Sequence, residues 1–176
     1  MTPLNVESLI KEAQIKKRVQ ELGQQIAKDF KGKSLLAVGV LNGSFIFYSD
    51  LIREIDADIH CEFIGISSYH NSNKSSGEVK VTMDLTTSVQ GRDVLIVEDI
   101  VDTGLTLDFL QKSLMLRGAR SVCAAALLFK PKALKAKLKI DYVGFEIGNE
   151  FVVGYGLDYQ GFYRNLPYIA QVSNIN

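Results

Sequence analysis

This sequence of 176 residues contains few cysteines and few histidines, and it has no excess of charge of either sign. Lysine and arginine together number 20, as do aspartate and glutamate, and a net charge near zero argues against bulk binding of nucleic acid. The two cysteines, Cys61 and Cys123, lie far apart in apolar or alternating runs, so we expect both to be buried thiols. His60 and His70 have no second histidine or cysteine at ligand spacing, so they do not form a metal-binding set.

Long apolar runs are also missing. No stretch approaches the length of a membrane span, and the first residues lack the cationic start and apolar block of a signal peptide. We therefore expect a cytoplasmic protein with no membrane partner. A chain of this length with 47% hydrophobic residues can bury one real core but is too short for two domains, so we predict a single domain over residues 1–176.

Helix-like and strand-like segments alternate along the chain. Ile15, Val19 and Leu22 begin a three- and four-residue apolar spacing that continues to Phe30 and stops at Gly32, which predicts a helix. The alternation is typical of an α/β fold with a parallel sheet covered by helices on both sides. We expect helices at about 11–30, 44–54 and 107–114, and strands at 34–40, 59–68, 93–99, 122–129, 142–145 and 151–154.

The carboxyl ends of parallel strands meet at one edge of the sheet, and ligands bind there in folds of this kind. The loops after four of the expected strands should therefore line one cleft. These loops follow Val40, Ser68, Asp99 and Phe129.

A polar stretch separates two strand-like segments in the first half of the chain. Residues 70–76 read HNSNKSS and contain almost nothing apolar, so they form either a flexible surface loop or a mobile lid. Alternating apolar residues at Val79, Val81 and Met83 predict a strand behind this stretch. The two strands together would form a long hairpin arm.

The most informative stretch is 94–107, which reads VLIVEDIVDTGLTL. Its first four residues suit a strand buried on both faces, and Glu98 and Asp99 follow directly. The next residues open a helical pattern, so their backbone N–H groups and two hydroxyls can hold a phosphate at a helix N-terminus. Carboxylates beside a phosphate site suit a sugar phosphate, because they accept hydrogen bonds from ribose hydroxyls or attract Mg2+. Taken singly, each piece also fits an ordinary structural role, such as Asp102 as a helix cap.

In this order the features resemble the phosphoribosyl-diphosphate (PRPP) signature of type I phosphoribosyltransferases. Residues 145–169, FEIGNEFVVGYGLDYQGFYRNLPYI, closely resemble the purine end of hypoxanthine-guanine phosphoribosyltransferases. The turn at 41–44, the pair at 68–69 and Lys130 extend the likeness over nearly the whole chain. The resemblance implies the type I phosphoribosyltransferase fold. That fold has a central parallel sheet flanked by helices, a small hood from about 145–176 with N-terminal residues, and a flexible lid at about 68–80.

The resemblance also implies a Mg2+-dependent reaction of purine salvage. Hypoxanthine or guanine displaces diphosphate from C1 of PRPP and gives the nucleoside 5′-monophosphate. C1 passes through an oxocarbenium-like state, and the attacking purine must lose a proton. Most of the catalysis is therefore positioning, neutralisation of charge and exclusion of water.

The family's functional residues map onto this sequence in four groups. Asp102, near the purine N7, is the candidate general base, and Ser68 and Tyr69 would close over the site. The PRPP ribose-phosphate group comprises Glu98, Asp99, Thr103, Gly104, Leu105 and Thr106. The diphosphate group comprises Asn42, Gly43 and Arg164, and the purine group comprises Lys130, Phe151, Val152 and Asp158. Mg2+ would be bound by Glu98, Asp99 and Asp158.

Two positions qualify this mapping. The turn at 41–44 resembles a diphosphate loop that contains a cis non-proline peptide, but many relatives have lysine or arginine where this chain has Asn42. The change removes a local positive charge and leaves the backbone donors. Lys130 would donate to the purine O6 and so favour a 6-oxo over a 6-amino group, although a lysine at a strand end is usually only solvated.

Two other functions compete with this interpretation. The same chemistry could prefer xanthine or guanine, since that choice depends on carbonyl positions around Val152 and Asp158. Alternatively, the chain could be a regulator that retains a PRPP pocket and binds RNA or a protein. Neutral charge and a complete purine end favour an enzyme that acts on small molecules. A homodimer or homotetramer is expected from the family.

Overall fold

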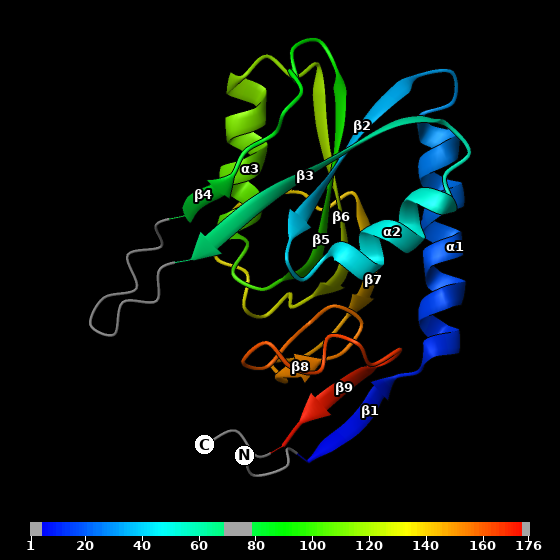
Figure 1. The fold of residues 1–176 in the computed structure, drawn as a ribbon, viewed down its shortest axis with the longest axis vertical. Coiled ribbons are helices and arrows are strands. Elements are labelled where there is room, and N and C mark those ends of the chain that lie inside the picture. Colours follow the sequence, from blue (N-terminus) through cyan, green and yellow to red (C-terminus); the bar gives the residue numbers. More distant parts are fainter. Residues whose placement is uncertain (1–4, 69–78, 174–176) are drawn as a thin grey trace.

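The computed structural model of the chain describes residues 5–68 and 79–173. Its centre is a six-stranded sheet in the order β4-β3-β2-β5-β6-β7 (Figure 1). Neighbouring strands are parallel except β4, which runs antiparallel to β3. The strands are β2 Ser34–Leu41, β3 Asp58–Ser68, β4 Val79–Met83, β5 Asp93–Val101, β6 Ser121–Phe129 and β7 Tyr142–Glu146. The α/β fold with a mostly parallel sheet is confirmed.

Helices cover both faces of this sheet (Figure 1). Helices α1 (Glu12–Asp29) and α2 (Phe45–Arg53) pack with Leu95 and Val97 of β5 in one core. Helix α3 (Leu105–Leu116) packs with Val94 and Ile96 in a second core on the opposite face. Because successive side chains of a strand point to opposite faces, both faces of β5 are apolar. The sequence predicted a strand buried on both faces from the continuous apolar run at 94–97, and this prediction is confirmed.

A second, three-stranded sheet lies below the carboxyl edge of the large one in the view of Figure 1. It has the antiparallel order β1-β9-β8 and joins the two ends of the chain. Its strands are β1 Val6–Ile10, β8 Val152–Val153 and β9 Ile169–Val172. Strands β1 and β9 were not expected from the sequence. The first four residues of β1 are exposed, so it has no alternating apolar pattern to reveal it.

Most expected elements are present with small shifts at their ends. The helix expected at 11–30 is α1, and the strand expected behind the polar stretch is β4, which pairs with β3 as a hairpin arm. Strand β5 extends to Val101, beyond the expected end at Asp99, because Ile100 pairs with β6 as well. Glu98 and Asp99 therefore lie inside the strand, where the sheet holds their backbone.

The expectation of two buried thiols was wrong for Cys61, which is exposed, while Cys123 is half-buried. Strand β4 pairs only with the last residues of β3, from Gly65 onward. The half of β3 that contains Cys61 therefore has a neighbouring strand on one side only. The side chains of a strand that has a neighbour on one side only are more exposed to solvent than those of a central strand.

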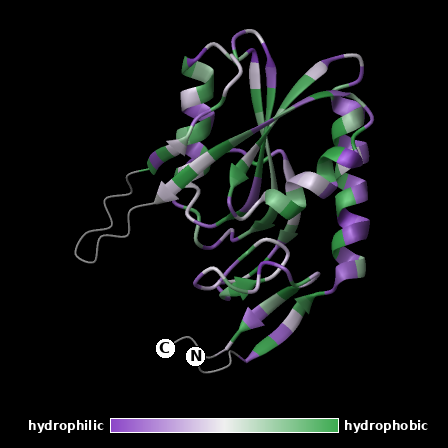
Figure 2. Cartoon of the chain, in the orientation of Figure 1, coloured by the Kyte–Doolittle hydropathy of each residue, from purple (hydrophilic) through white to green (hydrophobic). Residues whose placement is uncertain are grey.

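Polar and apolar residues alternate along the helices, as Figure 2 shows most clearly for α1. The buried side of α1 contains Ile15, Val19, Leu22 and Ile26. Among the helices in the described residues, none is long and apolar enough to cross a membrane.

A buried carboxylate holds the start of β5 against β6. Asp93 is 3% exposed and accepts hydrogen bonds from Arg120 Nε (2.9 Å) and from the Ser121 hydroxyl (2.6 Å). These contacts lower the pKa of Asp93 from 3.8 to about 2, the Arg120 hydrogen bond being the largest cause. The unfolded chain therefore binds this proton more tightly than the folded protein. The stabilisation is present above about pH 4 and is lost as the pH falls toward 2.

Asp93→Asn should therefore lower the free energy of unfolding by about 1–2 kcal/mol at pH 7, because Arg120 is largely exposed and solvent weakens the pair. The difference from the unmodified protein should shrink to about zero near pH 2. Urea unfolding at several pH values measures it. Asp108→Asn, which removes a surface pair with Lys112, is the control and should change stability by less than about 0.5 kcal/mol. A constant loss at all pH values would contradict the assignment.

Candidate active site

Three adjoining hollows form a cleft at the carboxyl ends of the strands. The hollow over the acids has a volume of about 470 Å3, the one at the start of α3 about 100 Å3, and the one beside Lys130 about 460 Å3. The first two share Glu98 and Thr106, and the last two share Asp102 and Thr103. The loops after β2, β3, β5 and β6 were expected to line one cleft. Residues from the ends of all four strands or their loops do so.

The smallest hollow lies where β5 turns into α3. Its lining includes Thr103, Gly104 and Thr106, the residues expected to hold a phosphate. Gly104 has a φ of 79°, and a Cβ there would lie 2.7 Å from Leu134, so both conformation and space require glycine. The first N–H groups of α3 have no partner within the helix and face this end. The loop therefore has the form of an anion site.

Leu105 differs from its neighbours in this loop. Its side chain is 40% exposed and lines an outer groove with β4, away from the small hollow. Its backbone N–H lies 3.5 Å from Thr103 Oγ1. Leu105 can therefore contribute to the site through its backbone only.

The two acids at the end of β5 are adjacent, and no cationic side chain of the described residues pairs with either of them. Glu98 is 6% exposed and Asp99 is half-buried, and neither forms an ion pair within the described residues. Burial raises the pKa of Glu98 well above its ordinary value, and the charge of Asp99 raises it further. Burial likewise raises the pKa of Asp99 to about 6, against the opposing charge of Arg164. Two carboxylates in this setting favour a bound cation or hydrogen-bond donor.

The turn after β2 packs directly on these acids. The peptide between Leu41 and Asn42 is cis, as the resemblance implied. A Cβ on Gly43 would lie 1.7 Å from Asp99 Oδ2, so any larger residue there would displace the Asp99 carboxylate or the turn. The buried Ser44 hydroxyl donates to the carbonyl of Val40 (2.6 Å) and fixes the turn at the start of α2. Asn42 is exposed and lines the hollow with Gly43.

Arg164 and Asp158 come from the C-terminal part of the chain to the same hollow. Their side chains form an ion pair of 2.6 Å, and Arg164 Nη1 donates to the carbonyl of Gly156 (2.6 Å). Asp158 also accepts from the backbone N–H of Gly161 at 2.7 Å. Arg164 is thus oriented by two acceptors while its charge reaches Asp99.

Lys130 and Asp102 face each other across the third hollow. Lys130 is 9% exposed, and its Nζ lies 3.9 Å from Asp102 Oδ2. The side chain of Asp102 is 53% exposed. No backbone N–H in the described part of the chain donates to it, and α3 begins after Gly104 instead. The alternative of Asp102 as a helix cap therefore has no support from the hydrogen bonds.

The remaining expected residues lie at or beyond the margin of these hollows. Phe151 is 40% exposed and makes an edge-on contact with Tyr159 at 5.8 Å between ring centroids, and Val152 is buried in β8. Neither lines the three hollows. Ser68 is the last residue of β3, and Tyr69 lies outside the described residues.

Some lining residues were not expected. Ile66 and Ser67 of β3 line the hollow over the acids, and their position at a strand end was the available signal. Lys132, Lys135 and Asn149 line the hollow beside Lys130. The lysine spacing after β6 is visible in the sequence, but it is equally typical of a solvated surface.

A turn with the form of an anion site, paired acids and an arginine lie at one edge of a mostly parallel sheet, where ligands bind in folds of this kind. The family model described as phosphoribosyl transferase domain matches residues 5–160, and the chain belongs to this family. The type I fold implied by the sequence is confirmed.

Individual relatives are similar over nearly the full chain. A hypoxanthine-guanine phosphoribosyltransferase of Bacillus subtilis (strain 168) is 52% identical, with 92% of this chain and 90% of the relative covered. One of Lactococcus lactis subsp. lactis (strain IL1403) is 50% identical, with coverage of 92% and 88%. A crystal structure of a Staphylococcus aureus hypoxanthine phosphoribosyltransferase has a TM-score of 0.91 at 47% identity, with coverage of 95% and 91%.

Proposed function

We propose that this protein transfers the 5-phosphoribosyl group of PRPP to hypoxanthine or guanine in purine salvage. The products are IMP or GMP and diphosphate. The observation that carries the proposal is the cleft itself, in which a turn with the form of an anion site, the adjacent acids Glu98 and Asp99, and Lys130 line adjoining hollows. Relatives named for this activity, about half identical over most of their length, support it.

PRPP would lie across the first two hollows. The backbone and hydroxyl groups of Thr103, Gly104 and Thr106 would bind the 5′-phosphate, with Leu105 adding its N–H alone. Glu98 and Asp99 would accept hydrogen bonds from the ribose hydroxyls. Asn42 and Gly43 would offer backbone N–H groups to the diphosphate. Arg164 would neutralise its charge with a planar pair of donors.

The same acids fit Mg2+ by their chemistry. Mg2+ prefers carboxylate oxygens and is usually held by one or two carboxylates together with substrate phosphates. Glu98 and Asp99 provide such a pair, with Asp158 nearby to contact the ion through water. Within the described residues no group of three or more histidine, cysteine, aspartate or glutamate side chains could hold a metal ion by itself. Bound Mg2+ would neutralise the departing diphosphate.

The purine would occupy the hollow beside Lys130. Asp102 would take the proton from the purine N7 region as general base. Lys130 would donate to O6, Phe151 would stack on the base and Val152 would offer backbone groups to its edge. The backbone carbonyl of Asp158 would meet a guanine 2-amino group.

We further propose that the small sheet acts as the hood and that residues 1–176 form one domain. The lid expected at about 68–80, with Ser68 and Tyr69 as the pair that excludes water, falls mainly outside the described residues and stays a prediction. A cytoplasmic homodimer or homotetramer with small-molecule substrates, and with no nucleic acid or membrane partner, completes the proposal.

The test is formation of nucleotide from PRPP, Mg2+ and a panel of hypoxanthine, guanine, xanthine and adenine. Turnover of hypoxanthine or guanine is expected, and adenine should react poorly. Preferred use of xanthine would support the first alternative, and RNA retention without turnover the regulatory one.

Lys130→Ala should lower kcat/KM for 6-oxopurines at least fivefold more than it weakens PRPP binding. Equal losses would make Lys130 structural.

A further inference from the structure

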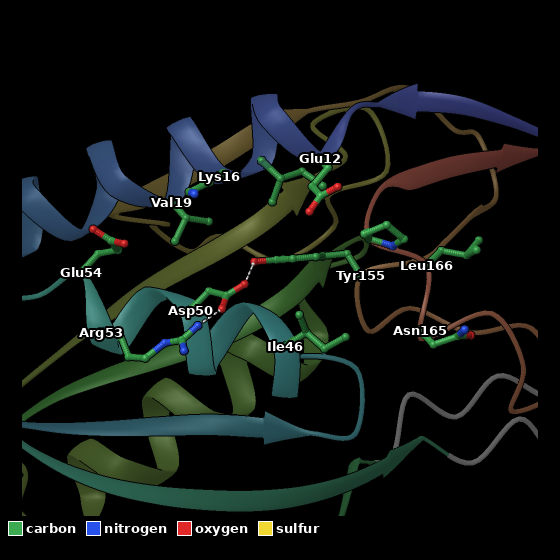
Figure 3. Close-up of a pocket in the computed structure, with 12 residues that line it drawn as sticks. Glu12, Lys16, Val19, Ile46, Asp50, Arg53, Glu54, Tyr155, Asn165 and Leu166 are labelled. Carbon is green, nitrogen blue, oxygen red and sulfur yellow. Dashed lines mark hydrogen bonds and ion pairs between the residues drawn. The ribbon is translucent and has the colours of Figure 1, made fainter.

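Helix α2 and the C-terminal segment are joined by one side-chain hydrogen bond. Tyr155 is 7% exposed, and its hydroxyl donates to Asp50 Oδ2 of α2 at 2.5 Å (Figure 3). The other oxygen of Asp50 accepts from Arg53, one turn along the same helix. Among the described residues, no other side-chain hydrogen bond joins α2 to residues 152–173.

A cavity lies beside this bond. About 400 Å3 of space lies between α1, α2 and the C-terminal segment, with Val19 of α1 on one wall and Ile46 of α2 on another (Figure 3). Tyr155 and Asp50 both line it. Tyr155 also belongs to the apolar core that contains Phe47 and Leu51 of α2, so the Tyr155–Asp50 bond adds a directional link to an apolar junction.

The backbone of Tyr155 is held in an unusual conformation. Its φ is 50°, in the left-handed region that residues other than glycine rarely adopt, and both neighbours are glycines with positive φ. The Tyr155 N–H donates to the carbonyl of Leu166 at 2.8 Å, and the Gly156 N–H to that of Arg164 at 2.9 Å. The turn at 154–158 is therefore fixed by the backbone on one side and by Asp50 on the other.

This turn contacts one end of the cleft and follows directly on the strand that we assign to the purine side. A Cβ on Gly156 would lie 2.1 Å from the carbonyl oxygen of Gly43, so the turn packs on the backbone of the diphosphate loop. Gly156 also accepts from Arg164, which pairs with Asp158. The strand that contains Val152, on the purine side, leads directly into the turn. The turn thus connects the diphosphate side of the cleft with its purine side.

We propose that Tyr155 and Asp50 are positioning residues whose hydrogen bond couples the purine side of the cleft to the diphosphate loop. A purine bound near Val152 shifts the turn as a rigid unit, and the bond transmits this shift to α2 and to the loop that precedes the helix. The protein therefore binds diphosphate more tightly when the purine is already bound, and binds the purine more tightly when diphosphate is already bound. The inference rests on the proposed function, because it assigns these two ligands to the cleft.

The experiment measures diphosphate affinity by calorimetry in Mg2+, with and without saturating hypoxanthine. Hypoxanthine should tighten diphosphate binding about tenfold in the unmodified protein, the size expected of one hydrogen bond to a carboxylate. Tyr155→Phe keeps the ring and removes the hydroxyl, so this factor should fall to about one or two. Asp50→Leu should have the same effect, and the double variant should lose nothing more. Asp50→Asn retains an acceptor oxygen and should restore most of the factor.

Tyr142→Phe is the matched control. Tyr142 is 5% exposed and donates to Asp29 of α1 at 2.9 Å, far from the cleft in the fold. Tyr142→Phe should lower thermal stability by about as much as Tyr155→Phe does, and it should leave the coupling between hypoxanthine and diphosphate unchanged. Equal loss in the control, unchanged coupling in Tyr155→Phe, or no coupling in the unmodified protein would each overturn the proposal. Nucleotide formation, assayed in parallel, shows separately whether the proposed function holds.

Discussion

Asp102→Asn is expected to lower kcat by about 10²-fold while PRPP binding stays within about threefold. Loss of a general base typically costs between 10² and 10⁴ in rate, because the amide has the same shape but cannot take the proton. Asp102 lines both the hollow at the start of α3 and the hollow beside Lys130. Steady-state kinetics with hypoxanthine and PRPP, together with PRPP titration, measure both quantities.

The Asp102 side chain is 53% exposed and its only ion pair in the described residues is with Lys130 at 3.9 Å, so its replacement should lower the melting temperature only slightly. Asp108→Asn, one turn into α3 and paired with Lys112 on the surface, serves as control and should change neither rate nor affinity. Unchanged turnover in Asp102→Asn would remove this residue from the chemistry. A large loss of stability would return it to a structural role.

Gly43→Ala is expected to lower kcat/KM for PRPP by about 10²-fold. The added methyl group would lie 1.7 Å from Asp99 Oδ2, so either the diphosphate loop or the acid must move by an ångström or more. Displacements of this size in a positioning element cost roughly 10²-fold in rate. Because the backbone of Gly43 is not in the left-handed region, the effect comes from space alone.

Gly32→Ala separates this effect from the general cost of replacing a glycine. Gly32 has a φ of 73° with nothing within 4 Å of an added Cβ, so alanine there strains the backbone without touching a neighbour. It should lower stability by about 1 kcal/mol and leave kcat/KM unchanged. If Gly43→Ala retains most of its kcat/KM, the close packing of loop and acid is not needed for catalysis.

The sheet was predictable because its strands are buried on both faces. Short apolar runs such as 94–97, bounded by polar residues, are typical of strands at the centre of a covered sheet, and the helical spacing from Ile15 to Phe30 fixed the extent of α1 closely. The small sheet was less visible, since β1 is mostly exposed and its partner β9 lies at the other end of the chain. Pairing of distant, short and exposed segments leaves almost no periodic signal.

The site was predictable as a set of residues and only partly as a geometry. The order of acids, Asp102 and the phosphate turn along 94–107 indicated the cleft. The sequence could not show that Leu105 points away from it, because that depends on where β4 packs. Nor could it show the contact of Tyr155 with Asp50, since a tyrosine between glycines has no distinctive spacing to a helix so far away in the chain.

The backbone of Gly156 packs against the backbone of Gly43, and Gly43 in turn packs against the carboxylate of Asp99. Anyone wishing to widen this end of the cleft for a bulkier sugar or leaving group must therefore rebuild three distant stretches of chain at once. The opposite end is bordered by Lys132, Lys135 and Asn149, which are exposed and outside the strands. The end beside Lys130 is accordingly easier to reshape than the end beside Asp99.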